Sequence, residues 1–401
     1  MRIIMFAGKG GVGKTSIAGA TGIRAADAGY TTLIMSLDIA HSLSDIFALS
    51  KGLVDQNKGM PLKISDRLWI QELDIQEEIE RNWGDVYKYI ASLFNTAGIE
   101  ETLAEELAIL PGMEEVSSLL HINRYVQGGD FDVIILDCAP TGESLRFISI
   151  PATLEWYIRK IFKIQRRVVS YVRPVVRRIY DVPLPEDSYF KALENLFERL
   201  EGVDAILTDP KITTVRLVTN PEKIVLKETQ RIFLYFSLYK MCIDAVVMNR
   251  ILPQSITEEY FRDWKESQKT YLKLAEEYFS PVPIFPVGLL QHEPLGEEKL
   301  RELGTSIYGD QDPTEHFFEE QPYEFHQQDG QFTMRIKLPF VSKEEVELNR
   351  LADEMVIRIG GFKKYIPLPR LVAAYKDVKA RMDGAYLNII FGGKKDGKGK
   401  A

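Results

Sequence analysis

A glycine-rich stretch near the amino terminus constrains the fold most strongly. Residues 7–16 read AGKGGVGKTS, and residues 8–15 satisfy the pattern G-x-x-x-x-G-K-[ST]. The apolar run over residues 3–7 indicates a short buried strand before it, and a helix over about residues 14–28 is expected after it. Backbone N–H groups of such a loop and the positive end of the helix bind phosphate. The stretch therefore predicts a nucleotide-binding phosphate loop.

The two lysines of this loop need separate explanations. Lys14 is placed to reach the terminal phosphates, and the hydroxyl of Thr15 is placed to ligate Mg²⁺. The residues expected to contact ATP are Gly8, Lys9, Gly10, Gly11, Val12, Gly13, Lys14, Thr15 and Ser16. Lys9 occupies an early position that points outward from a loop wrapped around phosphate. It either reaches whatever covers the site or adds positive charge to its own site.

Composition limits the size, partners and compartment of the protein. The chain has 401 residues, 45% of them hydrophobic, so it can bury a large core and form two or three domains. A net charge of −8 argues against nucleic-acid binding. No apolar run approaches the ~20 residues of a membrane span, so any membrane contact is expected to be peripheral. Two cysteines and no signal peptide fit the cytoplasm or, after removal of a transit peptide, the plastid stroma.

Two aspartates follow predicted strands. Asp38 comes after the strand expected over residues 31–37, and Asp137 ends the apolar run over residues 131–137, which is typical of a central parallel strand. Doubly wound sheets gather their chemistry at the carboxyl ends of strands, so both side chains are expected beside the phosphate loop. Asp137 is the candidate carboxylate on the Mg²⁺ side, acting through water. Asp38 could instead only cap the helix that follows it.

The loop sequence K-G-G-V-G-K-T over residues 9–15 resembles the deviant phosphate loop of a class of nucleotide-dependent dimers. This class includes the nitrogenase iron protein, the cell-division ATPase MinD, the arsenical pump ATPase and the tail-anchored-protein targeting ATPase. In that class the early lysine reaches across a homodimer to the partner's phosphates. The resemblance implies that Lys9 acts in catalysis together with Lys14, and that the chain is a homodimer that closes on ATP.

Two segments resemble the switches of the arsenical pump and tail-anchored targeting branch. Residues 38–47 are similar to its switch I, with Ile39 in place of the usual proline. This match implies that Asp38 orients or deprotonates the attacking water. Residues 137–146 are similar to its switch II, which implies that the backbone of Gly142 senses the terminal phosphate.

Four further segments match the same branch in order along the chain. They lie at residues 110–115, 215–231, 246–253 and 285–296. The third resembles the adenine-side strand and turn, which implies that Asn249 recognises the base. The fourth resembles the last loop over the nucleotide, with Pro286 and Glu293 as candidate contacts. The chain is therefore identified as a member of the arsenical pump and tail-anchored targeting ATPase family.

Cysteine content separates this chain from several members of the class. Metalloid binding needs several converging thiolates, and the chain has one phosphate loop and no cysteine cluster, so arsenite is a poor candidate substrate. The zinc-binding C-x-x-C pair of the eukaryotic targeting ATPase would fall within residues 250–285, which contain no cysteine, so no structural zinc is expected. Two cysteines match the count of the nitrogenase-type iron proteins. Cys138 and Cys242 are thus either cluster ligands or plain core thiols.

An amphipathic stretch occupies residues 151–180. Its apolar side chains share one helical stripe and its arginines and lysines face the other way, which predicts a helix over residues 154–180 bent near Pro174. In the targeting ATPases the matching region lines an apolar groove for a client's transmembrane segment. The helix could also pack on its own core or dock on an anionic membrane surface, and the sequence alone does not separate these three roles.

The chain changes character after residue 305. The acidic residues 306–325 predict a linker, and residues 326–392 alternate apolar and polar side chains in short runs, which predicts an antiparallel sandwich. This part resembles the α-crystallin domain of small heat-shock proteins, with an unrelated β appendage as the alternative. Residues 393–401 are expected to form a flexible tail.

These patterns predict an α/β fold. A doubly wound, mostly parallel P-loop NTPase domain over residues 1–305 carries a helical subdomain at about 75–125 and 151–200, and a small all-β α-crystallin-like sandwich follows. The predicted function is a Mg²⁺-dependent ATPase whose homodimer closure controls binding and release of an apolar client, such as a membrane-protein segment. The alternatives are the energising ATPase subunit of an anion or metalloid exporter, and an ATP-gated holdase that uses the β-domain.

Overall fold

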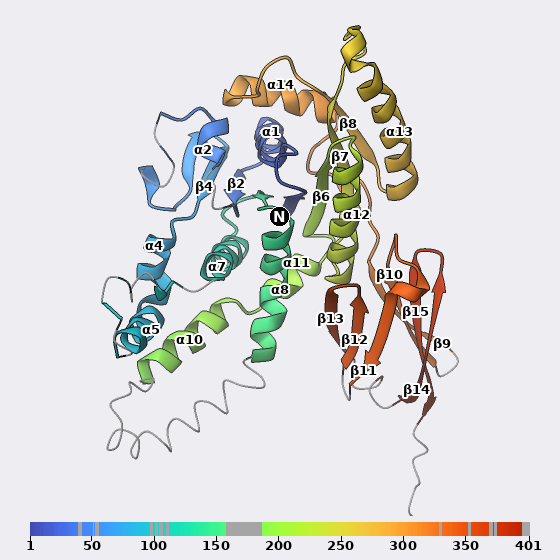
Figure 1. Ribbon diagram of the computed structural model, residues 1–401. Coiled ribbons are helices and arrows are strands. Elements are labelled where there is room, and N and C mark those ends of the chain that lie inside the picture. Colours follow the sequence, from blue (N-terminus) through green and yellow to red (C-terminus); the bar gives the residue numbers. More distant parts are fainter. Residues whose placement is uncertain are drawn as a thin grey trace, which may run out of the picture.

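The computed structural model describes most of the chain (Figure 1). The described residues are 1–38, 42–50, 52, 56–96, 99–100, 103, 107–109, 112–157, 187–328, 331–351, 354–368, 372 and 375–394. Ile39, most of the predicted amphipathic helix (158–180) and the end of the tail (395–401) therefore lie outside the description. No helix among the described residues is long and apolar enough to cross a membrane.

An eight-stranded sheet forms the centre of the larger part of the molecule. Its spatial order is β3 (Leu62–Ser65), β4 (Leu68–Glu72), β2 (Thr32–Ser36), β5 (Val133–Asp137), β1 (Arg2–Ala7), β6 (Thr213–Thr219), β7 (Ile243–Ile251) and β8 (Ile284–Gly288). All neighbouring pairs are parallel except β3 with β4. This is the mostly parallel sheet that the sequence predicted, and the carboxyl ends of its parallel strands meet at one edge.

Helices cover both faces of this sheet, and the period of the strands explains why. On β1, Ile3 and Met5 point into one core whereas Ile4 and Phe6 point into the other, because successive side chains alternate between faces. One face is covered by α1 (Lys14–Asp27), α2 (Ser42–Ile46) and α14 (Gly296–Tyr308). The other is covered by α7 (Met113–Gly128), α8 (Thr141–Tyr157), α11 (Val203–Thr208), α12 (Lys223–Leu238) and α13 (Arg262–Phe279). A doubly wound fold results.

A helical layer extends from the sheet beside α7. It contains α4 (Ile75–Glu78), the π-helix η1 (Ile79–Trp83), α5 (Gly84–Thr96) and α10 (Asp187–Arg199). The buried side chains of α10, namely Phe190, Leu193 and Leu196, share a small core with Trp83 and with Met113 of α7. Figure 1 shows α5 and α10 lying together, on the side of the molecule away from the C-terminal strands. The layer falls within the ranges where the sequence predicts a helical subdomain.

The C-terminal part is all β. A four-stranded antiparallel sheet has the order β14 (Tyr375–Asp383), β15 (Tyr386–Lys394), β10 (Gln331–Lys337) and β9 (Tyr323–Gln328). A three-stranded sheet contains β11 (Val346–Arg350), β12 (Glu354–Ile359) and β13 (Phe362–Pro367). Side chains from both sheets form one core, which confirms the predicted β-sandwich architecture.

The segment expected to be a linker is packed against the larger part. Residues 306–325 include the end of α14 and the start of β9. The guanidinium of Arg216 on β6, which is fully buried, donates hydrogen bonds to the carbonyl oxygens of Pro313 (2.7 Å) and Glu315 (3.0 Å). These hydrogen bonds could not be predicted from the sequence, because their acceptors are backbone carbonyl groups, which every residue type has.

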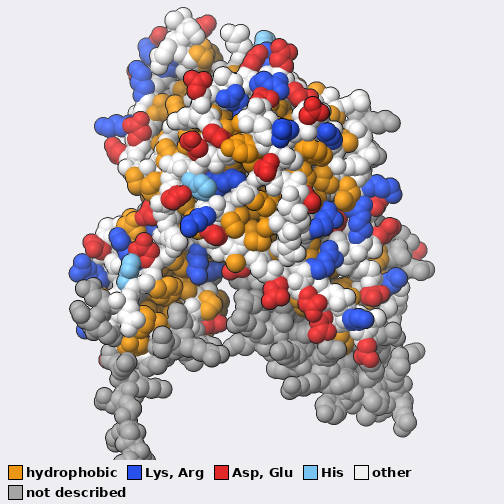
Figure 2. Space-filling view, turned by 180° about the vertical axis from the view of Figure 1, so that it is seen from behind, with side chains coloured by type: hydrophobic (Ala, Val, Ile, Leu, Met, Phe, Trp, Pro, Cys, Tyr) orange, Lys and Arg blue, Asp and Glu red, His pale blue; other side chains and the backbone are white. Residues whose placement is uncertain are grey.

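The β-sandwich also shares its core with α12. Leu234 and Leu238 of that helix lie in the same buried cluster as the sandwich residues, and the hydroxyl of Tyr323 donates a 2.6 Å hydrogen bond to the carbonyl oxygen of Leu238. The β-sandwich is thus joined to the larger part of the molecule through side-chain packing as well as through the chain. Seen from behind, Lys, Arg, Asp and Glu are interspersed with hydrophobic side chains over the visible face (Figure 2).

Candidate nucleotide-binding site

Close backbone contacts shape the phosphate loop between β1 and α1. A Cβ atom on Gly8 would lie 2.3 Å from the carbonyl oxygen of Val218 on β6. At Gly13, which has a left-handed φ of 95°, a Cβ atom would lie 2.5 Å from Nδ2 of Asn249 on β7. Both positions therefore require glycine. The loop, which follows β1, therefore also lies against β6 and β7, the next two strands of the sheet.

The two lysines of the loop differ in how far they are exposed. Lys14 is only 7% exposed, and its Nζ donates a 3.3 Å hydrogen bond to the carbonyl oxygen of Lys9. Lys14 is therefore held inside the loop of its own chain, where phosphates bind. The Lys9 side chain is half-buried and precedes the exposed Gly10 and Gly11. Lys9 is therefore more exposed than Lys14, and its outward orientation stays a prediction.

Asp137 is a buried carboxylate at the carboxyl end of β5. Its side chain is 1% exposed, and neither oxygen has a hydrogen-bond partner of normal geometry among the described residues. Burial raises the pKa of the Asp137 carboxyl to about 7, although the nearby Thr15 hydroxyl and Lys14 ammonium oppose that shift. A buried unpartnered carboxylate beside a threonine hydroxyl is a donor set that suits a hard divalent cation. The residues present therefore fit the expected Mg²⁺.

Asp38 lies next to Asp137 because their strands are neighbours. Ser36 pairs with Asp137 in the register of β2 and β5, and the N–H of Leu37 donates to the Asp137 carbonyl oxygen at 2.9 Å. The N–H of Asp38 contacts the Ser36 hydroxyl at 3.2 Å. The negative charge of Asp38 is among the smaller influences that raise the pKa of Asp137. The structure thus brings Asp38, Asp137, Thr15 and Lys14 to one edge.

The other predicted contacts lie around this edge at different depths. The side chain of Asn249 is buried, and its Nδ2 donates a 2.9 Å hydrogen bond to the carbonyl oxygen of Val12 in the phosphate loop. Gly142 is exposed in the first turn of α8. Pro286 on β8 and Glu293 in the loop after it are also exposed. The support that Asn249 gives to the loop was missed by the sequence reasoning, which assigned that residue to the base alone.

A cavity of about 480 Å³ separates Asp38 from the helical layer. The residues that line it include Asp38 and Cys138 at the strand ends, Gln76 on α4, Ser118 on α7 and Phe147 on α8. The cavity therefore borders both switches and the first turns of the helical layer. Movement of either switch would therefore change the shape of this cavity.

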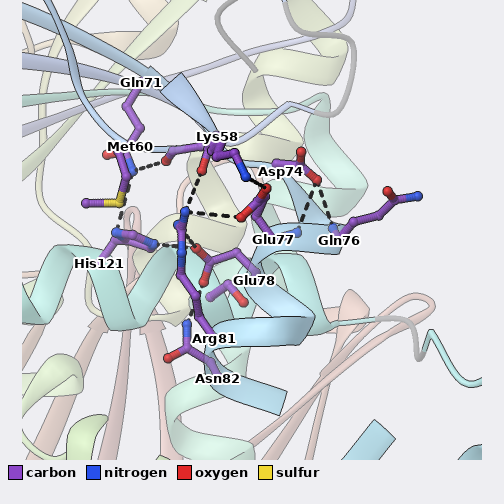
Figure 3. Close-up of polar contacts among 12 residues, drawn as sticks. Lys58, Met60, Gln71, Asp74, Gln76, Glu77, Glu78, Arg81, Asn82 and His121 are labelled. Atoms are coloured by element: carbon purple, nitrogen blue, oxygen red, sulfur yellow. Dashed lines mark hydrogen bonds and ion pairs between the residues drawn. The ribbon is translucent and has the colours of Figure 1, made fainter. Parts of the chain in front are cut away.

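A buried polar cluster fastens α4 to α7 beside this cavity (Figure 3). His121 Nε2 lies 2.8 Å from Glu78 Oε1, and Asn82 Nδ2 donates to Glu78 Oε2 at 2.6 Å. Burial alone would raise the pKa of Glu78, but His121, Asn82 and Arg81 outweigh it and lower that pKa. Sequence reasoning missed this cluster because Glu78 and His121 are 43 positions apart and belong to no motif.

Comparison with known proteins identifies relatives of the whole chain. The family described as anion-transporting ATPase matches residues 1–309, and the HSP20-like domain found in ArsA matches residues 329–391. "Putative arsenical pump-driving ATPase 1" of Aquifex aeolicus is 50% identical over 387 residues, covering 96% of this chain and 98% of that protein. "Putative arsenical pump-driving ATPase" of Chlorobaculum tepidum is 36% identical over 401 residues, covering 99% and 98%. "ATPase get3" of Pyrenophora tritici-repentis is 28% identical over 318 residues, covering 77% and 91%.

Proposed function

This chain belongs to the anion-transporting ATPase family and hydrolyses ATP, and from this premise we propose that it works as a Mg²⁺-dependent homodimer. Closure of the homodimer on ATP, followed by hydrolysis, controls the binding and release of an apolar client such as a membrane-protein segment. The predicted resemblance to the arsenical pump and tail-anchored targeting ATPases, with a heat-shock-like C-terminal domain, is confirmed by the two family matches.

The proposed chemistry uses the residues at the carboxyl edge of the sheet. The loop amides and Lys14 bind the phosphates, and the carboxylate of Asp38 orients the attacking water or takes its proton. Thr15 and Asp137 would hold Mg²⁺, which when bound supplies positive charge against the phosphate oxygens. The backbone of Gly142 contacts the terminal phosphate. Asn249 contacts the base while it supports the loop, and Pro286 and Glu293 border the nucleotide.

The homodimer part of the proposal depends on Lys9. The partial exposure of its side chain supports a role across the dimer, because an accessible cation in this loop could meet the phosphates of a second copy. A trans-acting cation at a transferring phosphoryl group is worth about 10³-fold or more in turnover. ATP would then be hydrolysed efficiently only when two copies are closed on it.

The position of α8 carries the client part of the proposal. This helix begins at Thr141, within switch II, and its Ile150 packs against the sheet core and also against the core of the helical layer. A change at switch II can therefore reach α7 and α10 through one rigid element. In Figure 1, α8 runs from the sheet toward the level of α10. Reshaping of this layer would alter the surface offered to an apolar client.

Capture of the client tests this proposal. The Asp38→Asn protein, held in ATP and Mg²⁺, should retain an apolar segment that mass spectrometry identifies among co-purifying material. The same protein prepared in ADP is the matched control and should retain much less. If the two preparations carry the same material, or neither carries an apolar segment, closure on ATP does not control client binding.

An exporter subunit is the second candidate, because the names of the Aquifex aeolicus and Chlorobaculum tepidum relatives refer to an arsenical pump. Only two cysteines, Cys138 and Cys242, are present, and both are buried and free. Burial raises the pKa of both thiols, which disfavours the thiolate form that a soft metalloid needs. The burial of the two thiols does not argue against transport of an anion other than arsenite.

A further inference from the structure

Glu72 is a buried carboxylate that accepts hydrogen bonds from residues of switch I. It is the last residue of β4 and is 1% exposed. Its Oε1 accepts hydrogen bonds from the backbone N–H groups of Leu43 (2.8 Å) and Ser44 (3.2 Å), and its Oε2 accepts from the Ser44 hydroxyl (3.4 Å). These groups lie in the first turn of α2, where backbone N–H groups are not used by the helix's own hydrogen bonds and can donate to a carboxylate. Glu72 thus fixes the start of α2 to the sheet.

The same part of the sheet also holds the beginning of switch I. Glu72 lies opposite Ser36 in the register of β4 and β2. The Ser36 hydroxyl contacts the N–H and the carbonyl oxygen of Asp38, each at 3.2 Å. Asp38 is therefore tied to the end of β2, whereas Leu43 and Ser44 are tied to the end of β4. These two strands are neighbours in the sheet.

We propose that Glu72 is a positioning residue for ATP hydrolysis, acting through Asp38. By holding Leu43 and Ser44 at the end of β4, beside the strand end that holds Asp38, it limits where the Asp38 carboxylate can lie and hence where that carboxylate meets the attacking water. This inference rests on the proposed role of Asp38. Glu72 is assigned a positioning role rather than a catalytic one because both of its carboxylate oxygens accept hydrogen bonds from Leu43 and Ser44.

Substitutions at Glu72 separate anchoring from charge. Glu72→Gln keeps a carbonyl oxygen that can accept from Leu43 and Ser44, so kcat should stay within about 3-fold of the wild type. Glu72→Ala removes both acceptors, and kcat should fall by about 100-fold, as expected when a catalytic group is misplaced by about 1 Å. The affinity for ATP should change by less than about 3-fold in both variants, because neither touches the phosphate loop.

A double-mutant cycle tests whether Glu72 acts through Asp38. In the Asp38→Asn background, Glu72→Ala should lower kcat by less than about 3-fold further, because the group that it positions is already lost. A full second loss of about 100-fold would overturn the inference. So would normal kcat in folded Glu72→Ala, or a Glu72→Gln protein as slow as Glu72→Ala.

The outcomes for the two residues are distinguishable. If Asp38→Asn turns over ATP normally, the proposed role of Asp38 fails whatever Glu72 does. If Asp38→Asn is slow and Glu72→Ala is normal, only the positioning role fails. Thermal unfolding establishes that each variant is folded. If Glu72→Ala does not fold, Glu72→Asp, whose carboxylate is withdrawn by one methylene, takes its place in the same cycle and should also lose kcat while keeping its ATP affinity.

Discussion

The side-chain amide of Asn249 donates a 2.9 Å hydrogen bond to the carbonyl oxygen of Val12, so a residue 237 positions away supports the phosphate loop. The other end of the amide is also engaged, because Asn249 Oδ1 accepts the N–H of Arg250 at 2.9 Å. The orientation of this amide is therefore fixed from both sides. A bound base in contact with Asn249 and bound phosphates in contact with the loop would therefore be linked through this hydrogen bond.

Removal of this amide should weaken binding even of a ligand without a base. Loss of a buried hydrogen bond costs about 1–3 kcal/mol, so Asn249→Ala should bind both ATP and tripolyphosphate about 10-fold more weakly. Isothermal titration of the two ligands measures this. Unchanged affinity for tripolyphosphate, with weaker ATP binding, would assign Asn249 to the base alone.

A methyl group at Gly13 should prevent the loop from binding nucleotide. Its Cβ would lie 2.5 Å from Asn249 Nδ2 at a φ of 95°, so Gly13→Ala should lose ATP binding. Gly29→Ala is the matched control, because Gly29 has a similar φ of 102° but nothing lies within 4 Å of its Cβ position. Both variants share the backbone strain, whereas only Gly13→Ala should fail in equilibrium binding. Equal ATP affinity in both would show that the contact with Asn249 is unimportant.

The two lysines of the loop should fail differently. Lys14→Ala should abolish activity, because it removes a charge from the phosphate site of its own subunit. Lys9→Ala should leave each subunit folded and able to bind ATP, but slower in hydrolysis by about 10³-fold, the scale for a trans-acting cation. Steady-state turnover and equilibrium binding of the two variants measure this difference.

Mixed dimers show directly whether Lys9 acts across the interface. In a dimer of one Lys9→Ala and one Asp38→Asn subunit, the nucleotide on the Lys9→Ala subunit keeps its own Asp38 and receives the partner's Lys9. One site should therefore recover activity. If verified mixed dimers are no more active than the two mutant homodimers combined, Lys9 does not act in trans between independently firing sites.

The hydrogen bonds that hold residues 306–325 against the sheet should contribute measurably to the free energy of unfolding. Arg216→Ala leaves Asp244 and the carbonyl groups of Pro313 and Glu315 without this buried partner. The free energy of unfolding should therefore fall by about 3–5 kcal/mol. Cleavage by a protease within residues 310–322 should become faster. Arg231→Ala is the control, since Arg231 is exposed and its ion-pair partner among the described residues is Glu228. It should cost less than about 1 kcal/mol, and an equal effect of both changes would contradict this contribution of the hydrogen bonds.

Arsenite should not stimulate ATP turnover. Both cysteines are buried, and burial raises the pKa of each thiol, so neither is ready to bind a metalloid as thiolate. Turnover measured with and without arsenite should agree, in the wild type and in the Cys138→Ala and Cys242→Ala proteins alike. If arsenite stimulates ATP turnover by the wild type and either cysteine substitution removes this stimulation, the result would instead support an arsenical pump function.

The sequence alone determined the ATPase class, the phosphate loop, the central strand that ends at Asp137 and the β character of the C-terminal part. These features depend on local patterns: residues 8–15 specify a loop by glycines at fixed spacing, and the apolar run that ends at Asp137 specifies a central strand. Because parallel strands end at one edge, Asp38 and Asp137 could be placed together without coordinates.

Only the tertiary structure decided which residues support that site. Asn249 with Val12, Glu72 with Leu43, and Arg216 with Pro313 each join a side chain to a backbone group far away in the sequence. A backbone N–H or C=O is present at nearly every position, so its partner leaves no pattern of residue types to read. Such contacts arise when strands align in register, and the register of distant strands becomes visible only in the folded chain.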